Sequence, residues 1–135
     1  MGGTGKRRAS VYTRETLKVA TRMTEHQEQV AFVQWCDRKQ IIYFAVPNGG
    51  FRHPATAVML RAEGVKPGVP DLFFPHARGG FHGLFVEMKR PYPRGALSAV
   101  QQEWIDKLKK QGYAVEVAWG MDQAVKIVED YLALP

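Results

Sequence analysis

The sequence predicts a single α/β domain, built as an α/β sandwich in which a mixed central sheet of about four strands is flanked by helices. Segments with helical spacing of apolar residues alternate with short runs of β-branched and aromatic residues, in the order α-β-α-β-β-α-β-α. Two of these runs are separated only by a glycine turn, which predicts a hairpin, whereas helices join the others. The sheet therefore combines antiparallel and parallel pairs.

The first predicted elements are a helix at 25–39, a strand at 41–46 and a helix at 54–63. Thr24 is placed as the N-cap of the first helix, with Gln27 as its capping-box partner. The run at 41–46 consists of apolar, mostly β-branched and aromatic residues and predicts a buried strand. Pro54 suits the first turn of the next helix and Gly64 suits the position just after its end.

The remaining predicted elements are strands at 71–74, 83–89 and 114–119 and helices at 98–111 and 121–132. The glycines at 79–80 lie between the first two of these strands and predict their hairpin. Ser98 is placed as an N-cap with Gln101 at the matching capping-box position. Alternating apolar residues mark the last strand, and apolar residues at helical spacing mark the last helix.

Charge divides the chain into two unequal parts. The 135 residues carry a formal net charge of +6, of which residues 1–22 contribute +5 and residues 23–135 only +1. The first ten residues are rich in glycine and lack apolar periodicity. We therefore expect a flexible basic N-terminal arm at 1–22 and one domain at 23–135. Phosphate contact and a mere solubilising role both remain open for the arm.

Several classes of protein are excluded by composition and motifs. A single cysteine, Cys36, rules out a disulfide framework or a cysteine-based zinc site and favours a cytoplasmic location. No stretch approaches the roughly 18 apolar residues of a membrane-spanning helix, and residues 1–10 lack the apolar core of a secretory signal. The histidines lack the spacing of a zinc site, and no Gly-Lys-Ser/Thr completes a P-loop after the glycines at 64–68.

The residues that point to chemistry lie on the predicted hairpin. Asp71 begins its first strand, and strand alternation places Phe85, Glu87 and Lys89 on one face of the second. A carboxylate and an ammonium group on an inner strand are costly to bury unless they are paired or bind something. If the strands pair, the two carboxylates converge and, with a main-chain carbonyl and waters, form an oxygen site suited to Mg²⁺.

The same spacing also has a plain structural interpretation. Glu87 and Lys89 fit an edge strand whose Glu–Lys face is solvated, because this spacing is common in strands. The spacing alone therefore does not separate a metal site from a polar surface.

The wider sequence pattern favours a metal site over a polar surface. Five blocks occur in order, namely Glu25 with Gln29, then 44–50, 64–72, 85–89 and 97–101. Pro70-Asp71 and Glu87-Met88-Lys89 within them match the PD-(D/E)XK signature, and all five blocks together resemble the VRR-NUC domain in its compact stand-alone form, over roughly residues 24–132. The resemblance implies a PD-(D/E)XK nuclease-like α/β sandwich. Val100 stands where the family often has an acid, a departure at a peripheral position.

The resemblance assigns roles to the hairpin residues. It implies that Asp71 and Glu87 are direct metal ligands and that the main-chain carbonyl of Met88 completes the set. It implies that Lys89 is the catalytic lysine, which positions or activates the attacking water or stabilises charge on the phosphate. The metal is expected to be Mg²⁺, with Mn²⁺ as a substitute.

Two helical residues join this set through the resemblance. Glu25 matches an acid that supports the metal directly or through water, and Glu28 one turn later is the alternative. Glu25 is also explained as a first-turn acid favoured by the helix dipole. Gln101 matches a glutamine of the catalytic site, and it is also explained as the capping-box partner of Ser98. Both roles of Gln101 are compatible.

Candidates for DNA contact occupy the surrounding loops, namely Asn48, Arg52, Lys66, Arg90 and Arg94. Asn48 has an alternative role as a turn residue, and Lys66 as a solvated loop lysine. Arg90 and Arg94 flank the loop that follows the predicted active strand, which places them better for DNA.

The function implied is that of a Mg²⁺-dependent endodeoxyribonuclease, which leaves a 3′-hydroxyl and a 5′-phosphate. Compact members of the resembled family look like structure-specific nucleases, some of them similar to Holliday-junction resolvases, in bacteria or phage-infected cells. A C2 homodimer would match the two symmetric strands of a four-way junction. The alternatives are a nuclease of broader duplex, flap or nicking specificity and a non-catalytic DNA-binding module on the same fold. The second would need a broken metal site, whereas Asp71, Glu87 and Lys89 are chemically competent.

Overall fold

The computed structural model describes residues 22–47 and 53–135. These residues form helices α2 (Glu25–Arg38), α3 (Pro54–Ala62), α4 (Ala99–Lys110) and α5 (Met121–Leu132), and strands β1 (Phe44–Ala45), β2 (Leu72–Phe74), β3 (Leu84–Lys89) and β4 (Ala114–Trp119). The predicted order of elements is confirmed. The predictions for residues 1–21 of the arm and for Asn48 and Arg52 fall outside the described residues.

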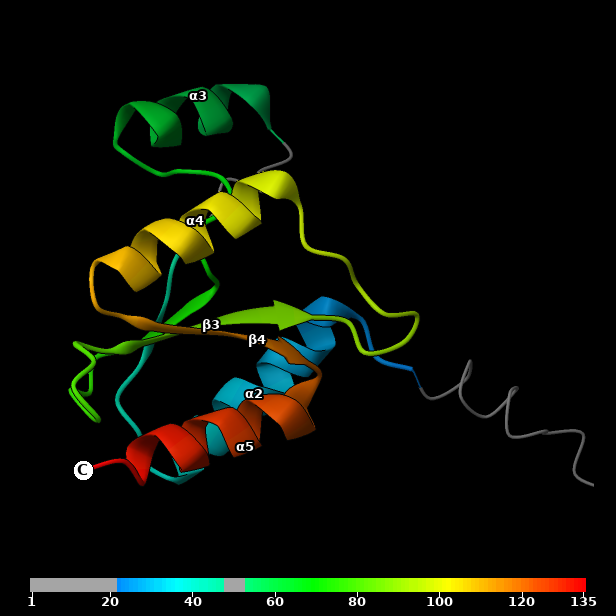
Figure 1. Cartoon of the computed structure of the whole chain (residues 1–135). Coiled ribbons are helices and arrows are strands. Elements are labelled where there is room, and N and C mark those ends of the chain that lie inside the picture. Colours follow the sequence, from blue (N-terminus) through cyan, green and yellow to red (C-terminus); the bar gives the residue numbers. More distant parts are fainter. Residues whose placement is uncertain (1–21, 48–52) are drawn as a thin grey trace, which may run out of the picture.

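The strands form one sheet in the order β1-β2-β3-β4. The pairs β1–β2 and β2–β3 are antiparallel, which confirms the predicted hairpin, and the pair β3–β4 is parallel. Helices α2 and α5 pack side by side against one face of the sheet, and α4 packs against β4 on the other face (Figure 1). The domain is therefore the mixed α/β sandwich that the sequence predicts.

The alternation along β3 separates two environments. Leu84, Val86 and Met88 are fully buried in the layer shared with α2 and α5, where Phe32 and Val128 also lie. Burial of each large apolar side chain contributes about 1.5–3 kcal/mol. On the opposite face an aromatic row runs across the strands, with ring centroids 5.3 Å apart for Phe44–Phe73, 4.5 Å for Phe73–Phe85 and 5.3 Å for Phe85–Tyr113. Glu87 and Lys89 continue along β3 on this second face, towards α4.

The prediction of a buried strand at 41–46 is wrong. Only Phe44 and Ala45 form β1, and the side chains of Ile42 and Phe44 are 65% and 52% exposed. The run has high strand propensity, but β1 lies at the edge of the sheet and pairs with β2 alone. Composition predicted a strand correctly but could not predict that no described helix covers it.

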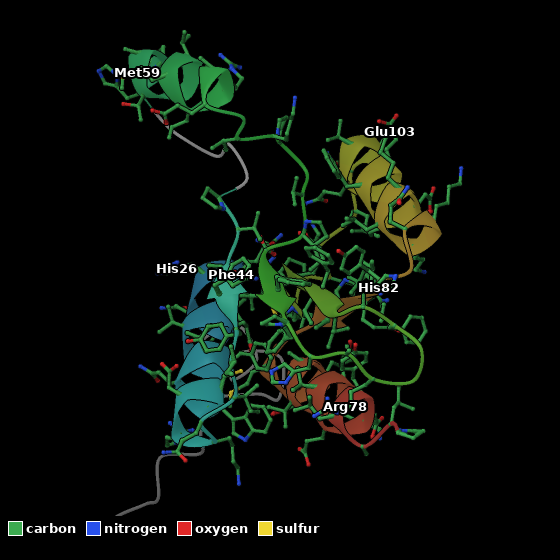
Figure 2. The ribbon with its side chains drawn as sticks, turned by 90° about the vertical axis from the view of Figure 1, so that its left-hand side faces the viewer. His26, Phe44, Met59, Arg78, His82 and Glu103 are labelled. Carbon is green, nitrogen blue, oxygen red and sulfur yellow. The ribbon has the colours of Figure 1, made fainter. Side chains whose placement is uncertain are left out.

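Helix α3 stands apart from the other described helices and strands. None of its side chains is buried, and Met59 is 63% exposed at its outer side (Figure 2). Pro54 occupies its first turn, and Gly64 follows its end with a φ of 102°, as predicted. The chain then returns to the sheet through the loop at 64–70, which runs between α3 and α4 (Figure 1) and approaches the first turn of α4 closely at Gly68.

Gly68 lets this loop approach α4 closely. Its φ is 86°, and a Cβ there would lie 2.3 Å from Val100 Cγ1, 3.1 Å from the Val100 main-chain carbon and 3.2 Å from Gln101 N. The side chain of Val100 can rotate away, but the two backbone atoms belong to the first turn of α4. A side chain at position 68 therefore requires the first turn of α4, which carries Gln101, to shift by a few tenths of an ångström.

We predict that Gly68→Ala lowers the free energy of unfolding by about 2–4 kcal/mol, because backbone strain and overpacking add together. Gly64→Ala is the matched control, since Gly64 has a φ of 102° but nothing within 4 Å of the added Cβ. The control should lose only about 1–2 kcal/mol from its backbone conformation. Urea unfolding of both variants measures the difference, and equal losses would contradict the close approach described here.

Candidate active site

The strand register brings the two predicted acidic ligands together. In the antiparallel pair, Leu72 lies opposite Val86, which is the last registered pair of β2 and β3. One step further along the same register, Asp71 faces Glu87. Residues directly opposite in an antiparallel pair have Cβ atoms about 4.5–5.5 Å apart and lie on the same side of the sheet. Two carboxyl groups therefore meet where the hairpin strands separate.

Both carboxyl groups are buried. Asp71 is 7% exposed and Glu87 is 1% exposed, while Lys89 on the same face is 7% exposed. The interpretation as a solvated Glu–Lys surface is therefore wrong, because β3 is an inner strand between β2 and β4. We call Asp71, Glu87 and Lys89 the acid centre.

One oxygen of the acid centre lacks a donor. Glu87 Oε1 accepts a hydrogen bond of 3.0 Å from Gln101 Nε2 and lies 3.9 Å from Lys89 Nζ. The other oxygen, Oε2, is buried and accepts no hydrogen bond from any of the residues that the structure describes. Leaving a buried carboxylate oxygen unsatisfied is costly. The position therefore needs either a proton or a cation.

The pKa of Glu87 reflects the same problem. Burial, and then the charge of Asp71, raise the pKa of Glu87 to about 9, against the smaller opposing effect of Lys89. A proton shared with Asp71 further favours the neutral form of Glu87. Without a cation, these effects favour the protonated form of Glu87, and a cation between the two carboxyl groups would displace that proton.

Asp71 is anchored by the main chain of the neighbouring strand. Its Oδ2 accepts a hydrogen bond of 2.8 Å from the N–H of Met88. The N–H and C=O of one strand residue point to the same side, so the Met88 carbonyl also points towards the β2 side of β3. The predicted carbonyl ligand therefore faces the side on which Asp71 lies.

Gln101 joins the acid centre to the start of α4. Its side-chain oxygen accepts hydrogen bonds from Lys89 Nζ at 2.8 Å and from the main-chain N–H of Ser98 at 2.9 Å. Its amide nitrogen donates to Glu87, and its own main-chain N–H bonds Ser98 Oγ at 3.1 Å. Gln101 is thus both a capping-box residue and a contact of the acid centre, as the sequence allowed.

The two candidate glutamates of α2 have different surroundings. The pKa of Glu25 is raised by partial burial, lowered by Lys89, raised by Asp71 and lowered by Arg90, so its carboxyl group lies within electrostatic reach of the acid centre. Glu28 Oε2 instead accepts a hydrogen bond of 2.7 Å from the N–H of Met121, at the first turn of α5. Gly120, the N-cap of α5, provides no side-chain cap. Glu28 therefore caps α5, and Glu25 is the better candidate to support a metal.

The oxygen donors fit a divalent cation. No three His, Cys, Asp or Glu side chains within residues 22–47 and 53–135 lie close enough to hold an ion by themselves. The available set is two carboxylates, a main-chain carbonyl and water, with Glu25 further out. Hard cations such as Mg²⁺ prefer oxygen ligands and keep several waters, so a protein set of this size suits them.

Comparison with known proteins assigns the chain to a family. The family model of the VRR-NUC domain matches residues 13–122. The chain belongs to the VRR-NUC family. It is similar to a solved structure titled "VRR_NUC domain protein", at 29% sequence identity and a TM-score of 0.71, over 84% of this chain and 92% of that chain. A search of curated proteins found no match.

Membership of the VRR-NUC family makes the chain a nuclease, with DNA as its substrate class. VRR-NUC domains generally use divalent metals, which agrees with the oxygen donors of the acid centre. Among the described residues, no helix is long and apolar enough to cross a membrane.

The predicted DNA-contacting residues of this VRR-NUC domain are distributed unevenly. Arg90 and Arg94 lie in the loop directly after β3, beside the acid centre, and both are exposed. The Arg94 guanidinium lies 3.9 Å from the centroid of the Trp119 ring. Lys66 is exposed in the loop before Asp71. Asn48 and Arg52 lie outside the described residues.

Sequence reasoning missed the contacts that join distant segments. The cap from Glu28 to α5, the stacking of Arg94 on Trp119 and the approach of Gly68 to Val100 each connect positions separated by 25 or more residues. One signal was present, because Gly120 before the last helix has no side chain with which to cap it. That signal shows that a cap has to come from elsewhere, but not from which residue.

We predict that Glu87→Gln stabilises the metal-free VRR-NUC domain. The raised pKa means that the folded state binds a proton more tightly than the unfolded state, so wild-type stability falls as pH rises from about 4.5 towards 9. A glutamine removes this dependence and can donate to Asp71. In EDTA, the two proteins should be equally stable near pH 4.5, and the variant should become the more stable one as the pH rises to 8, by at most about 1.4 kcal/mol for each pH unit.

Urea unfolding at several pH values measures this difference. Asp130→Asn is the control, because Asp130 is an exposed carboxylate 3.0 Å from Lys126 on α5. A pH-independent difference between wild type and Glu87→Gln would show that Glu87 is ionised in the metal-free fold.

Proposed function

We propose that this VRR-NUC domain is a Mg²⁺-dependent DNA endonuclease, in which Asp71, Glu87 and the carbonyl of Met88 hold the metal and Glu25 supports it through water. Mn²⁺ would substitute for Mg²⁺. The observation that carries the proposal is the buried Glu87 Oε2, which has no hydrogen-bond donor within the described part of the chain and belongs to a carboxyl group facing Asp71. A divalent cation held by these residues would activate water for attack at phosphorus and offset the charge of the phosphate.

Lys89 supplies the hydrogen-bond donors of the reaction. An ammonium group has three donors, and in the fold one of them binds Gln101 Oε1 at 2.8 Å. The other donors can orient the attacking water or contact a non-bridging phosphate oxygen as negative charge develops on it. Burial at 7% exposure keeps bulk water from competing for these contacts.

Gln101 keeps the lysine and the carboxylate in fixed positions. One side-chain amide bonds Lys89 through its oxygen and Glu87 through its nitrogen. Because the capping box also holds that amide, neither Lys89 nor Glu87 can shift without disturbing the first turn of α4. Fixed positions matter for the reaction rate beyond the strength of these hydrogen bonds, since a misplacement of a reacting group by about 1 Å can lower the rate about 100-fold.

We further propose that the substrate is branched DNA, of the kind found at a Holliday junction, and that the active form is a homodimer. A four-way junction presents two equivalent strands related by a twofold axis, and a C2 dimer presents two equivalent active sites. A near-neutral folded domain, with a net charge of +1 over residues 23–135, has little general affinity for duplex DNA. Shape and strand geometry would then contribute more to substrate choice.

We predict that Asp71→Asn and Lys89→Gln each lower the cleavage rate of a labelled four-way junction in Mg²⁺ by about 100-fold or more. Asp71→Asn removes a metal ligand while keeping its shape, and Lys89→Gln removes the charged donor. Asp130→Asn serves as the matched control for the loss of a carboxylate and should cleave like wild type. Wild-type rates in both active-site variants would refute the assignment of the acid centre.

We predict that the wild-type protein cleaves a four-way junction at least about 10-fold faster than linear duplex of the same sequence, and single strands and flaps more slowly than the junction. Relative rates at one fixed salt concentration measure this preference, because DNA affinities depend steeply on salt. Sedimentation of the protein with and without the junction measures the dimer. Equal rates on all four substrates would favour a nuclease of broad specificity instead.

A further inference from the structure

A small pocket lies next to the acid centre at the start of α2. It has a volume of about 280 Å³ and is lined by Arg22, Met23, Thr24, Arg90 and Pro93. Arg90 directly follows Lys89 in the chain, and Thr24 directly precedes Glu25. The pocket is therefore one residue away from Lys89 of the acid centre on one segment and one residue away from Glu25 on the other.

Two arginines converge on this pocket without a carboxylate. Arg22 precedes α2 and Arg90 follows β3, and no Asp or Glu lines the space between them. Within the described residues, neither arginine lies within 4.0 Å of a carboxylate oxygen. Two like charges that share a pocket repel each other, and an anion bound between them removes that repulsion.

Arg90 is held in place by the loop that follows it. Its Nε donates to the carbonyl of Pro93 at 2.9 Å, and its own carbonyl accepts from Gly95 N at 2.8 Å. The carbonyl of Gly95 in turn accepts a hydrogen bond of 2.8 Å from Trp119 Nε1. A guanidinium group has five N–H donors, so four remain for a ligand after the bond to Pro93. The arginine is thus oriented before any ligand arrives.

The pocket and the candidate site share two segments of the chain, the start of α2 and the end of β3. The pKa of Glu25 responds to Lys89 and Asp71 on one hand and to Arg90 on the other, so the carboxyl group of Glu25 lies within electrostatic reach of both the acid centre and the pocket. A DNA strand with one phosphate at the acid centre has further phosphates on both sides of it. One of these can reach the two arginines.

We propose that the pocket formed by Arg22, Arg90 and Thr24 binds a backbone phosphate of the cleaved DNA strand, close to the phosphate that is cut. The inference rests on the proposed nuclease function and adds a binding subsite to it. The guanidinium groups are the donors, because the capping box of α2 already occupies the main-chain N–H groups of Thr24 and Gln27. Arginine suits this role, since its planar group can bind two phosphate oxygens at once.

The experiment removes negative charge from single DNA phosphates and positive charge from single arginines of the protein. Junction DNA is prepared with a single neutral methylphosphonate at each phosphate flanking the cleavage site in turn. Binding is measured with Ca²⁺ in place of Mg²⁺, for wild type, Arg22→Ala, Arg90→Ala and the control Arg38→Ala. Arg38 is exposed at the far end of α2, so its loss removes the same charge about 20 Å away from Arg22.

At one methylphosphonate position, the wild type should lose about 5–10-fold in affinity. On unmodified DNA, Arg22→Ala and Arg90→Ala should each lose affinity by a similar factor. The methylphosphonate at that position should then cause no further loss of affinity in either variant. Each should also lower the slope of log affinity against log salt by about 0.9. Arg38→Ala should still show the full methylphosphonate effect. Both pocket arginines are exposed, and an unchanged urea midpoint would confirm that the variants are folded.

Two other results would overturn the subsite. In the first, the affinity losses caused by Arg22→Ala and Arg90→Ala add to the loss caused by the methylphosphonate at every position. The arginines would then attract DNA only through their general positive charge. If Arg38→Ala behaves like the pocket variants, the effect is not local. In either case, intact cleavage by the wild type would leave the nuclease function standing, whereas absence of both cleavage and DNA binding would refute both proposals.

Discussion

Two carboxyl groups that face each other in a buried position determine what the rest of this domain has to provide. Asp71 and Glu87 cannot both be ionised there without a counter-charge, because burial and mutual repulsion act in the same direction. In the metal-free fold, burial and the charge of Asp71 raise the pKa of Glu87, which favours a proton on its carboxyl group. A divalent cation would also meet this constraint, because it could contact both carboxyl groups, including the otherwise unsatisfied Oε2 of Glu87.

The surrounding structure holds these groups from three directions. Met88 N anchors Asp71 from within the sheet, and Gln101 anchors Glu87 and Lys89 from α4. The end of β3 is fixed from the opposite layer, because the carbonyl of Lys89 accepts a hydrogen bond of 3.0 Å from Gly120 N, and Glu28 caps the helix that begins there. A helix cap and a strand end thus serve the site without touching the reacting atoms.

Much of this could be predicted from the sequence, because local rules govern it. The capping boxes at Thr24 and Ser98, the turn after α3 and the alternation along β3 depend on neighbours within a few residues. The burial of β1 could not be predicted, because it depends on which helices cover the sheet edge. The same holds for the choice between Glu25 and Glu28, since Met121, which binds Glu28, lies 93 residues away. In the sequence, Glu25 and Glu28 are equivalent acids one helical turn apart, and only the fold shows that Glu28 binds Met121.

The distribution of charge follows from the same constraint. The domain at 23–135 has a net charge of only +1, yet its acids and bases are not mixed evenly around the site. Asp71 and Glu87 lie in the acid centre with Glu25 within electrostatic reach of it, while Arg90 and Arg94 lie in the loop immediately after β3. A bound cation would offset the carboxylates and leave the arginines as the dominant local charge. The attraction for DNA would then depend on metal occupancy, which would couple substrate binding to the presence of the ion that the proposed chemistry uses.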